Sequence, residues 1–129
     1  MKLVRLKINK KFRSLFKGFE INFREDEPNV NWEKFHPFCF AGLNGSGKSN
    51  VLEALANIFY HLECCTLNEN YSEYLKNDFN NDKSEVDAYE LEYYIIPRDS
   101  NKNSFEDYQR VYIKKEKGKI PYINITKET

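Results

Sequence analysis

Residues 38–62, which read FCFAGLNGSGKSNVLEALANIFYHL, decide the expected fold. The stretch begins with a short apolar run over residues 38–41, continues through a glycine-rich segment over 42–47, and ends in a segment over 48–62 without Pro or Gly. A short, wholly apolar run is typical of a strand that is buried on both faces, as in a parallel sheet. The stretch therefore predicts a buried strand, a loop and a helix in direct succession.

The segment over residues 48–62 carries apolar residues at helical spacing, which favours an amphipathic helix. Its central stripe is expected to consist of Leu52, Leu55, Ala56 and Phe59, and this stripe is widened by Val51, Ile58 and Leu62.

Elsewhere in the chain, five segments alternate apolar and polar residues as half-buried strands do. These segments are residues 3–8, 19–23, 88–96, 109–114 and 120–125. We expect the first two to form an antiparallel hairpin, and the last two to form a second hairpin around a charged turn over 115–119. The expected fold class is α/β: a P-loop strand and helix with an antiparallel β arm, in which residues 66–87 form an exposed excursion.

The glycine-rich segment satisfies the pattern G-x-x-x-x-G-K-[ST], which is a phosphate-binding loop. Glycines let successive backbone N–H groups turn towards phosphate oxygens, and the following helix adds its positive dipole end. In this interpretation Lys48 contacts the phosphates of ATP, and the Ser49 hydroxyl ligates Mg²⁺. A glycine-rich turn without a ligand is the alternative. The predicted nucleotide contacts are Gly42, Asn44, Gly45, Ser46, Gly47, Lys48, Ser49 and Asn50.

Length and composition limit the classes of protein that fit. The chain has 129 residues, which is enough for one domain, and it carries 20 basic and 20 acidic residues. No apolar run approaches the roughly 18 to 20 residues that a spanning helix needs, so we expect a cytoplasmic protein without membrane contact. The three cysteines, Cys39, Cys64 and Cys65, are expected to be reduced thiols.

The zero net charge conceals blocks of opposite sign. Residues 1–24 contain eight basic residues against one acidic residue, residues 63–92 contain nine acidic against two basic residues, and residues 110–127 contain six basic against one acidic residue. Basic blocks of this kind can line a face that binds a polyanion such as double-stranded DNA. The alternative is that they are solvated faces of strands and loops.

The loop and helix, together with Phe12-Arg13-Ser14 near the N-terminus, resemble the SMC/RecF-like branch of ABC-type ATPases. The amino-acid sequence of the loop is most similar to that of AAA-family ATPases found beside bacterial restriction systems. The resemblance implies an N-terminal ATP-binding lobe over residues 1–129, which pairs with the C-terminal half of the head or with a second head around ATP. It also implies a role in bacterial DNA defence or repair, and it places Arg13 near the nucleotide.

The chain departs from that family's pattern in its catalytic residues. A Walker B strand ending in Asp-Glu, a signature loop and a switch histidine are not found in the sequence. We therefore expect an incomplete head that binds ATP and Mg²⁺ but does not hydrolyse ATP alone, and no residue is assigned a catalytic role. Two alternatives stay open at this point: a self-contained small P-loop kinase, and a non-catalytic interaction module.

Overall fold

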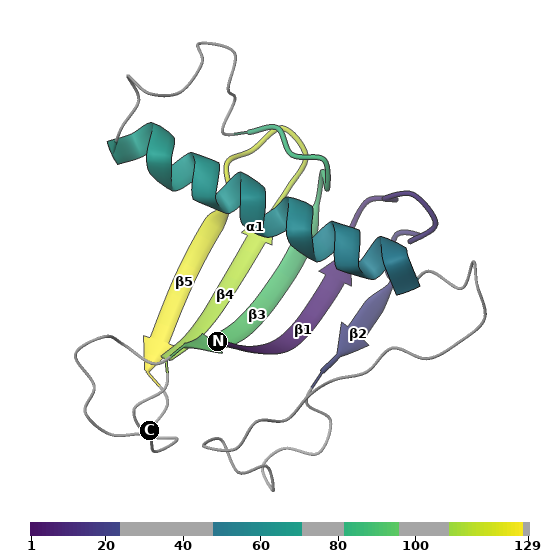
Figure 1. Cartoon of the computed structure of the whole chain (residues 1–129), viewed down its shortest axis with the longest axis horizontal. Coiled ribbons are helices and arrows are strands. Elements are labelled where there is room, and N and C mark those ends of the chain that lie inside the picture. Colours follow the sequence, from purple (N-terminus) through teal and green to yellow (C-terminus); the bar gives the residue numbers. More distant parts are fainter. Residues whose placement is uncertain (24–47, 71–81, 96–108, 128–129) are drawn as a thin grey trace, which may run out of the picture.

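The computed structural model describes residues 1–23, 48–70, 82–95 and 109–127. Within these parts of the chain, five strands form one antiparallel sheet, and a long helix lies across one face of it (Figure 1). This is the expected α/β class, whereas the expected strand over residues 38–41 lies outside the described residues. The elements are β1 (Lys2–Ile8), β2 (Glu20–Asn22), α1 (Lys48–Asn70), β3 (Tyr89–Ile95), β4 (Gln109–Lys115) and β5 (Tyr122–Lys127).

The strands lie in the order β2-β1-β3-β4-β5. Both predicted hairpins are confirmed, because β1 pairs antiparallel with β2 and β4 pairs antiparallel with β5. The strand β3 lies between them and pairs with β1 on one side and with β4 on the other. The two hairpins, which are far apart in the sequence, are therefore joined into a single sheet.

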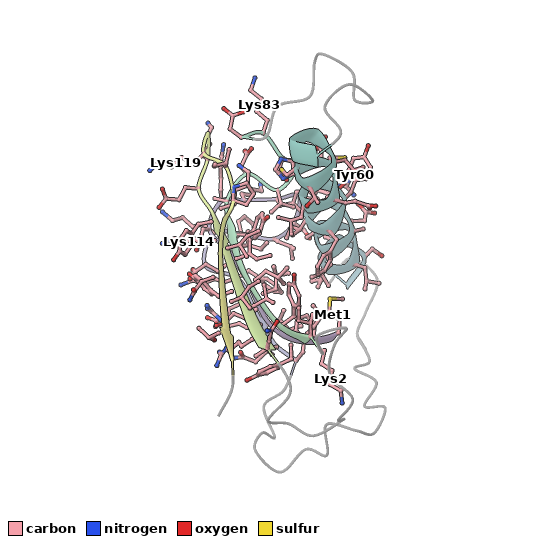
Figure 2. All side chains as sticks on the ribbon, turned by 90° about the vertical axis from the view of Figure 1, so that its left-hand side faces the viewer. Met1, Lys2, Tyr60, Lys83, Lys114 and Lys119 are labelled. Atoms are coloured by element: carbon pink, nitrogen blue, oxygen red, sulfur yellow. The ribbon has the colours of Figure 1, made fainter. Side chains whose placement is uncertain are left out.

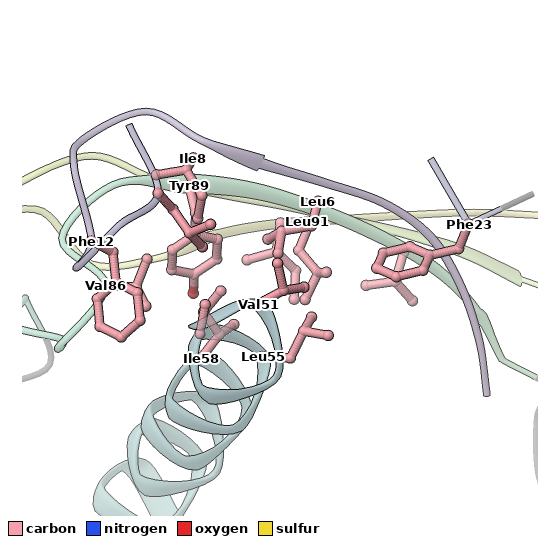
Figure 3. Close-up of a cluster of buried hydrophobic side chains, with 14 residues drawn as sticks. Leu6, Ile8, Phe12, Phe23, Val51, Leu55, Ile58, Val86, Tyr89 and Leu91 are labelled. Atoms are coloured by element: carbon pink, nitrogen blue, oxygen red, sulfur yellow. The ribbon is translucent and has the colours of Figure 1, made fainter. Parts of the chain in front are cut away.

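One face of the sheet is apolar because the strand alternation is in register across it. Leu91 of β3 lies opposite Leu6 of β1 and opposite Ile113 of β4, and all three side chains are buried. Tyr89 is also fully buried on this face. Figure 3 shows the side chains of Leu6, Tyr89 and Leu91 meeting those of α1, so the core lies between the sheet and the helix.

The helix packs on the sheet through much of the predicted stripe, but its buried side is centred nearer to Val51 and Ile58 than to Leu52. Its buried residues are Val51, Ala54, Leu55 and Ile58, which follow one another at helical spacing. Leu52, which was expected in the central stripe, is 55% exposed, and Ala56 is exposed as well. The predicted stripe is wider than the side that the sheet covers, so periodicity did not fix the centre of the buried side, and contact with the sheet decided it.

The helix is also longer than predicted, since it ends at Asn70 and not near residue 62. Residues 66–70 are mostly polar and were predicted to open an exposed excursion, but they contain neither Gly nor Pro to stop a helix. The rest of the predicted excursion is described only from residue 82, and its Val86 is fully buried in the core.

Lys115 was predicted in a charged turn, and this prediction was wrong. Lys115 is the last residue of β4 and is 1% exposed, on the same face of the sheet as Val111 and Ile113. Its Nζ donates hydrogen bonds to the carbonyl oxygens of Asp82, Asp87 and Glu116 at 2.9, 3.2 and 3.3 Å. A lysine can be buried when its ammonium group is satisfied in this way, and local sequence does not reveal such partners.

Candidate functional site

The first turn of α1 carries the end of the predicted phosphate-binding loop. The helix begins at Lys48, so the backbone of Lys48 and Ser49 stands at the positive end of the helix dipole. Ser49 is exposed, and the first turn of α1 contains no acidic residue. This end of the helix is therefore suited to an anion. Residues Gly42, Asn44, Gly45, Ser46 and Gly47 lie outside the described part of the chain, as does the side chain of Lys48.

The loop between β1 and β2 contains a tight two-residue turn. Phe12 and Leu15 exchange two backbone hydrogen bonds of 2.9 Å, and both side chains are buried in the core. Between them, Arg13 has a φ of 52°, in the left-handed region that a side chain disfavours. Strain of this kind persists only where the surrounding structure holds it, and the anchors Phe12 and Leu15 do so here.

The turn over residues 12–15 contacts the first two turns of α1. The side-chain amide of Asn50 donates a hydrogen bond to the Ser14 hydroxyl. Arg13 forms an ion pair with Glu53 through its Nη1 atom. Asn50 and Glu53 are three positions apart and therefore lie on the same side of the helix. The structure thus brings the predicted residues Arg13, Ser49 and Asn50 to one end of α1.

A family model described as an AAA domain matches residues 5–129. The chain belongs to the AAA domain family. AAA domains have a nucleotide-binding function of the ATPase type, typically with Mg²⁺. No curated protein and no solved structure matches the chain. Within the described residues of this AAA domain, no helix is long and apolar enough to cross a membrane.

Nucleotide with Mg²⁺ fits the residues at the start of α1 in this AAA domain. The exposed Ser49 hydroxyl is the kind of oxygen ligand that Mg²⁺ accepts. Glu53, the first acidic residue along α1, is paired with Arg13, so its charge is compensated. Within the described residues, this end of α1 therefore offers helix-start N–H groups that would suit phosphate and a hydroxyl that would suit Mg²⁺.

The face of the sheet that points away from α1 is charged, as Figure 2 shows in its edge-on view. Arg5 of β1 forms ion pairs with Glu92 of β3 at 2.8 Å and with Glu20 of β2 at 3.2 Å. Arg110 of β4 contacts the other oxygen of Glu92 at 3.0 Å. The acidic strand β3 lies between the basic strands β1 and β4, so the charge blocks of the sequence compensate each other across the sheet.

The same face of this AAA domain contains a hydrogen-bonded carboxylate. The Tyr112 hydroxyl donates to Glu90 at 2.7 Å, and the Asn9 amide donates to Glu90 at 3.1 Å. The bond from Tyr112 lowers the pKa of Glu90 below its ordinary value, with help from Asn9 and the nearby Arg5. Burial and the same bond raise the pKa of Tyr112 to about 12. These interactions favour the ionised form of Glu90, which lies on the charged face of the sheet.

Cys64 and Cys65 of α1 are thiols that form no disulfide, and Cys39 lies outside the described residues. The Sγ atom of Cys65 lies 3.7 and 3.8 Å from the two ring nitrogens of His61, which is buried. Burial raises the pKa of the Cys65 thiol, which disfavours the reactive thiolate. Among the described residues, no group of three His, Cys, Asp or Glu side chains is placed to hold a metal ion.

Two residues at this site had no predicted role. Ser14 and Glu53 both belong to stretches that carried the family resemblance, but neither is a nucleotide contact in the predicted set. Their role depends on a contact between residues that are 36 or more positions apart, as in the hydrogen bond from Asn50 to Ser14. One signal was present: Glu53 is the first acidic residue after the loop, in a position where an uncompensated negative charge would disfavour phosphate.

Proposed function

We propose that this AAA domain binds ATP with Mg²⁺ through residues 42–49, as the N-terminal lobe of an SMC/RecF-like ATPase. The observation that carries the proposal is the position of Lys48 and Ser49 in the first turn of a helix that is packed firmly on the sheet. A rigid helix start holds backbone donors in place for phosphate, which is the physical requirement of a phosphate-binding loop. The family match supports the same ligand.

The test is calorimetric titration of ATP with Mg²⁺ into the chain and into Lys48→Ala. We expect the substitution to abolish measurable ATP binding, because it removes the cation that contacts the phosphates. The matched control is Lys119→Ala in the turn between β4 and β5, where the same charge is lost from a lysine that is 72% exposed. Equal ATP affinity in the Lys48→Ala variant and the wild-type chain would refute the proposal.

We further propose that a complete catalytic site forms only with the C-terminal half of the head or with a second head. The support is the sequence, in which the Walker B, signature and switch residues of such ATPases are not found. The purified 129-residue chain should therefore show a negligible steady-state ATPase rate. A robust rate from this chain alone would contradict the proposal.

For a bacterial DNA-associated role, the support is the resemblance of the loop and of Phe12-Arg13-Ser14. The charge pattern of the sheet gives no support for direct DNA binding there, because Glu90 and Glu92 lie between the basic strands. If DNA is a partner, we infer that it is contacted outside this face of the sheet. Binding of duplex DNA with a steep salt dependence that is lost on substitution of Arg5 and Arg110 would contradict that inference.

A further inference from the structure

The ion pair between Arg13 and Glu53 borders the proposed nucleotide site. The side chain of a helical residue covers the turn that precedes it, so the Glu53 carboxylate lies over the turn that carries Ser49 and Asn50. An uncompensated carboxylate in that place would repel the phosphates of ATP. The pairing with Arg13 compensates the charge of this carboxylate, which explains how Glu53 can stand beside an anion site.

Contacts within the protein hold the backbone of Arg13 in place without a ligand. The two hydrogen bonds between Phe12 and Leu15 close the turn, and the Ser14 hydroxyl is held by Asn50. The guanidinium carbon of Arg13 also lies 5.2 Å from the centre of the Phe12 ring. The turn thus fixes the backbone from which the Arg13 side chain extends, and the guanidinium group reaches Glu53.

A guanidinium group has five N–H donors in a rigid plane, so it can bind a carboxylate and a phosphate at the same time. Glu53 contacts Arg13 at Nη1. We propose that Glu53 is a positioning residue, which holds the Arg13 guanidinium beside the phosphates of bound ATP. This inference rests on the proposed function, and it adds a residue that the loop motif does not contain.

The proposal makes opposite predictions for one substitution in two backgrounds. In the wild-type chain, Glu53→Gln should weaken ATP binding about tenfold, because the ion pair that orients Arg13 is lost. In the Arg13→Ala background there is nothing to orient, and Glu53 only repels phosphate. There, Glu53→Gln should strengthen ATP binding about threefold. If Glu53 served folding alone, the effect of Glu53→Gln on ATP affinity would not change sign between the two backgrounds.

The experiment is calorimetric titration of ATP with Mg²⁺ into five forms of the full 129-residue chain, at one ionic strength. They are the wild-type chain, Glu53→Gln, Arg13→Ala, Arg13→Ala with Glu53→Gln, and the control Glu63→Gln. Glu63 is exposed on the same helix, roughly 15 Å further along its axis, and its substitution removes the same charge. ATP affinity of the control should equal that of the wild-type chain, and thermal unfolding verifies that every variant is folded.

The outcomes separate the inference from the function on which it rests. Weakened binding by Glu53→Gln, with the opposite effect in the Arg13→Ala background, supports the positioning role. Unchanged or tighter binding by Glu53→Gln in the wild-type chain overturns it, and so does an equal loss in both backgrounds. A wild-type chain that does not bind ATP overturns the proposed function as well.

Discussion

The two ends of α1 differ in what surrounds their polar side chains. At the N-terminal end, the side chains of Arg13 and Glu53 are 52% and 45% exposed and meet in an ion pair. Near the other end, close enough to influence the thiol of Cys65, Lys115 is buried and donates to three backbone carbonyl oxygens. Exposed polar groups can exchange water for a ligand, whereas buried groups are committed to their protein partners. The polar groups at the first end are therefore open to a ligand, whereas those at the second end serve stability.

The largest expected effect concerns the apolar body of the helix between these ends. Ile58 is fully buried against the sheet, so Ile58→Ala should lower the free energy of unfolding by about 3 kcal/mol through the lost contacts and the cavity. Leu52 is mostly exposed, so Leu52→Ala should change the free energy of unfolding by less than about 0.5 kcal/mol. Urea unfolding followed by circular dichroism measures both. Equal losses in the two variants would show that the helix turns another side to the sheet.

The next effect tests the buried end directly. Lys115→Met keeps the apolar stem but removes the ammonium group, which leaves three carbonyl oxygens without their donor. The free energy of unfolding should fall by about 2 kcal/mol, because unsatisfied buried polar groups are unfavourable. ATP affinity, measured where the variant is still folded, should equal that of the wild-type chain. If Lys115→Met left the free energy of unfolding unchanged but weakened ATP binding, the different roles of the two ends would be contradicted.

The smallest effect concerns the strained turn at the exposed end. Arg13 has a positive φ, which glycine adopts freely and alanine does not. Arg13→Gly should therefore be more stable to urea than Arg13→Ala by about 1 kcal/mol. Both variants lack the guanidinium group, so both should lose ATP affinity to a similar extent. Equal stability of the two variants would mean that the turn carries no backbone strain in solution.

Local patterns were sufficient to locate the strands of the sheet. The alternation of Tyr89, Leu91, Tyr93 and Ile95 predicted a strand and the side of it that is apolar, and the structure confirms both. The same alternation contains no information on which strand lies beside it. The pairing of β1 with β3 joins Leu6 to Leu91, and it depends on the burial of two apolar faces that are distant in the sequence.

The charge blocks also show that local sequence does not reveal which strands lie side by side. The basic blocks at the two ends of the sequence suggested a surface for a polyanion, with solvated strand faces as the alternative. The strand order inserts the acidic residues Glu90 and Glu92 between Arg5 and Arg110. Basic and acidic segments that are separate in the sequence are thus neighbours in the sheet. This arrangement favours the alternative of a solvated strand face.

The helix shows where a pattern is ambiguous. The predicted apolar stripe included both Leu52 and Ile58, and helical spacing did not show which of the two faces the core. Only the sheet, which covers Ile58 and leaves Leu52 exposed, distinguished them. Lys115 is a comparable case, because the carbonyl groups that make its burial tolerable come from another segment at Asp82 and Asp87.

The sequence by itself determined the phosphate-binding motif at Gly42 to Ser49, the types of the described elements and the two hairpins, because these are properties of contiguous residues. The tertiary structure alone decided that the turn with Arg13 lies against Glu53, that β3 joins the two hairpins, and that Lys115 is buried. The physical reason is that these contacts depend on which apolar surfaces exclude water together. That choice is made by the whole chain when it folds, and no short segment encodes it.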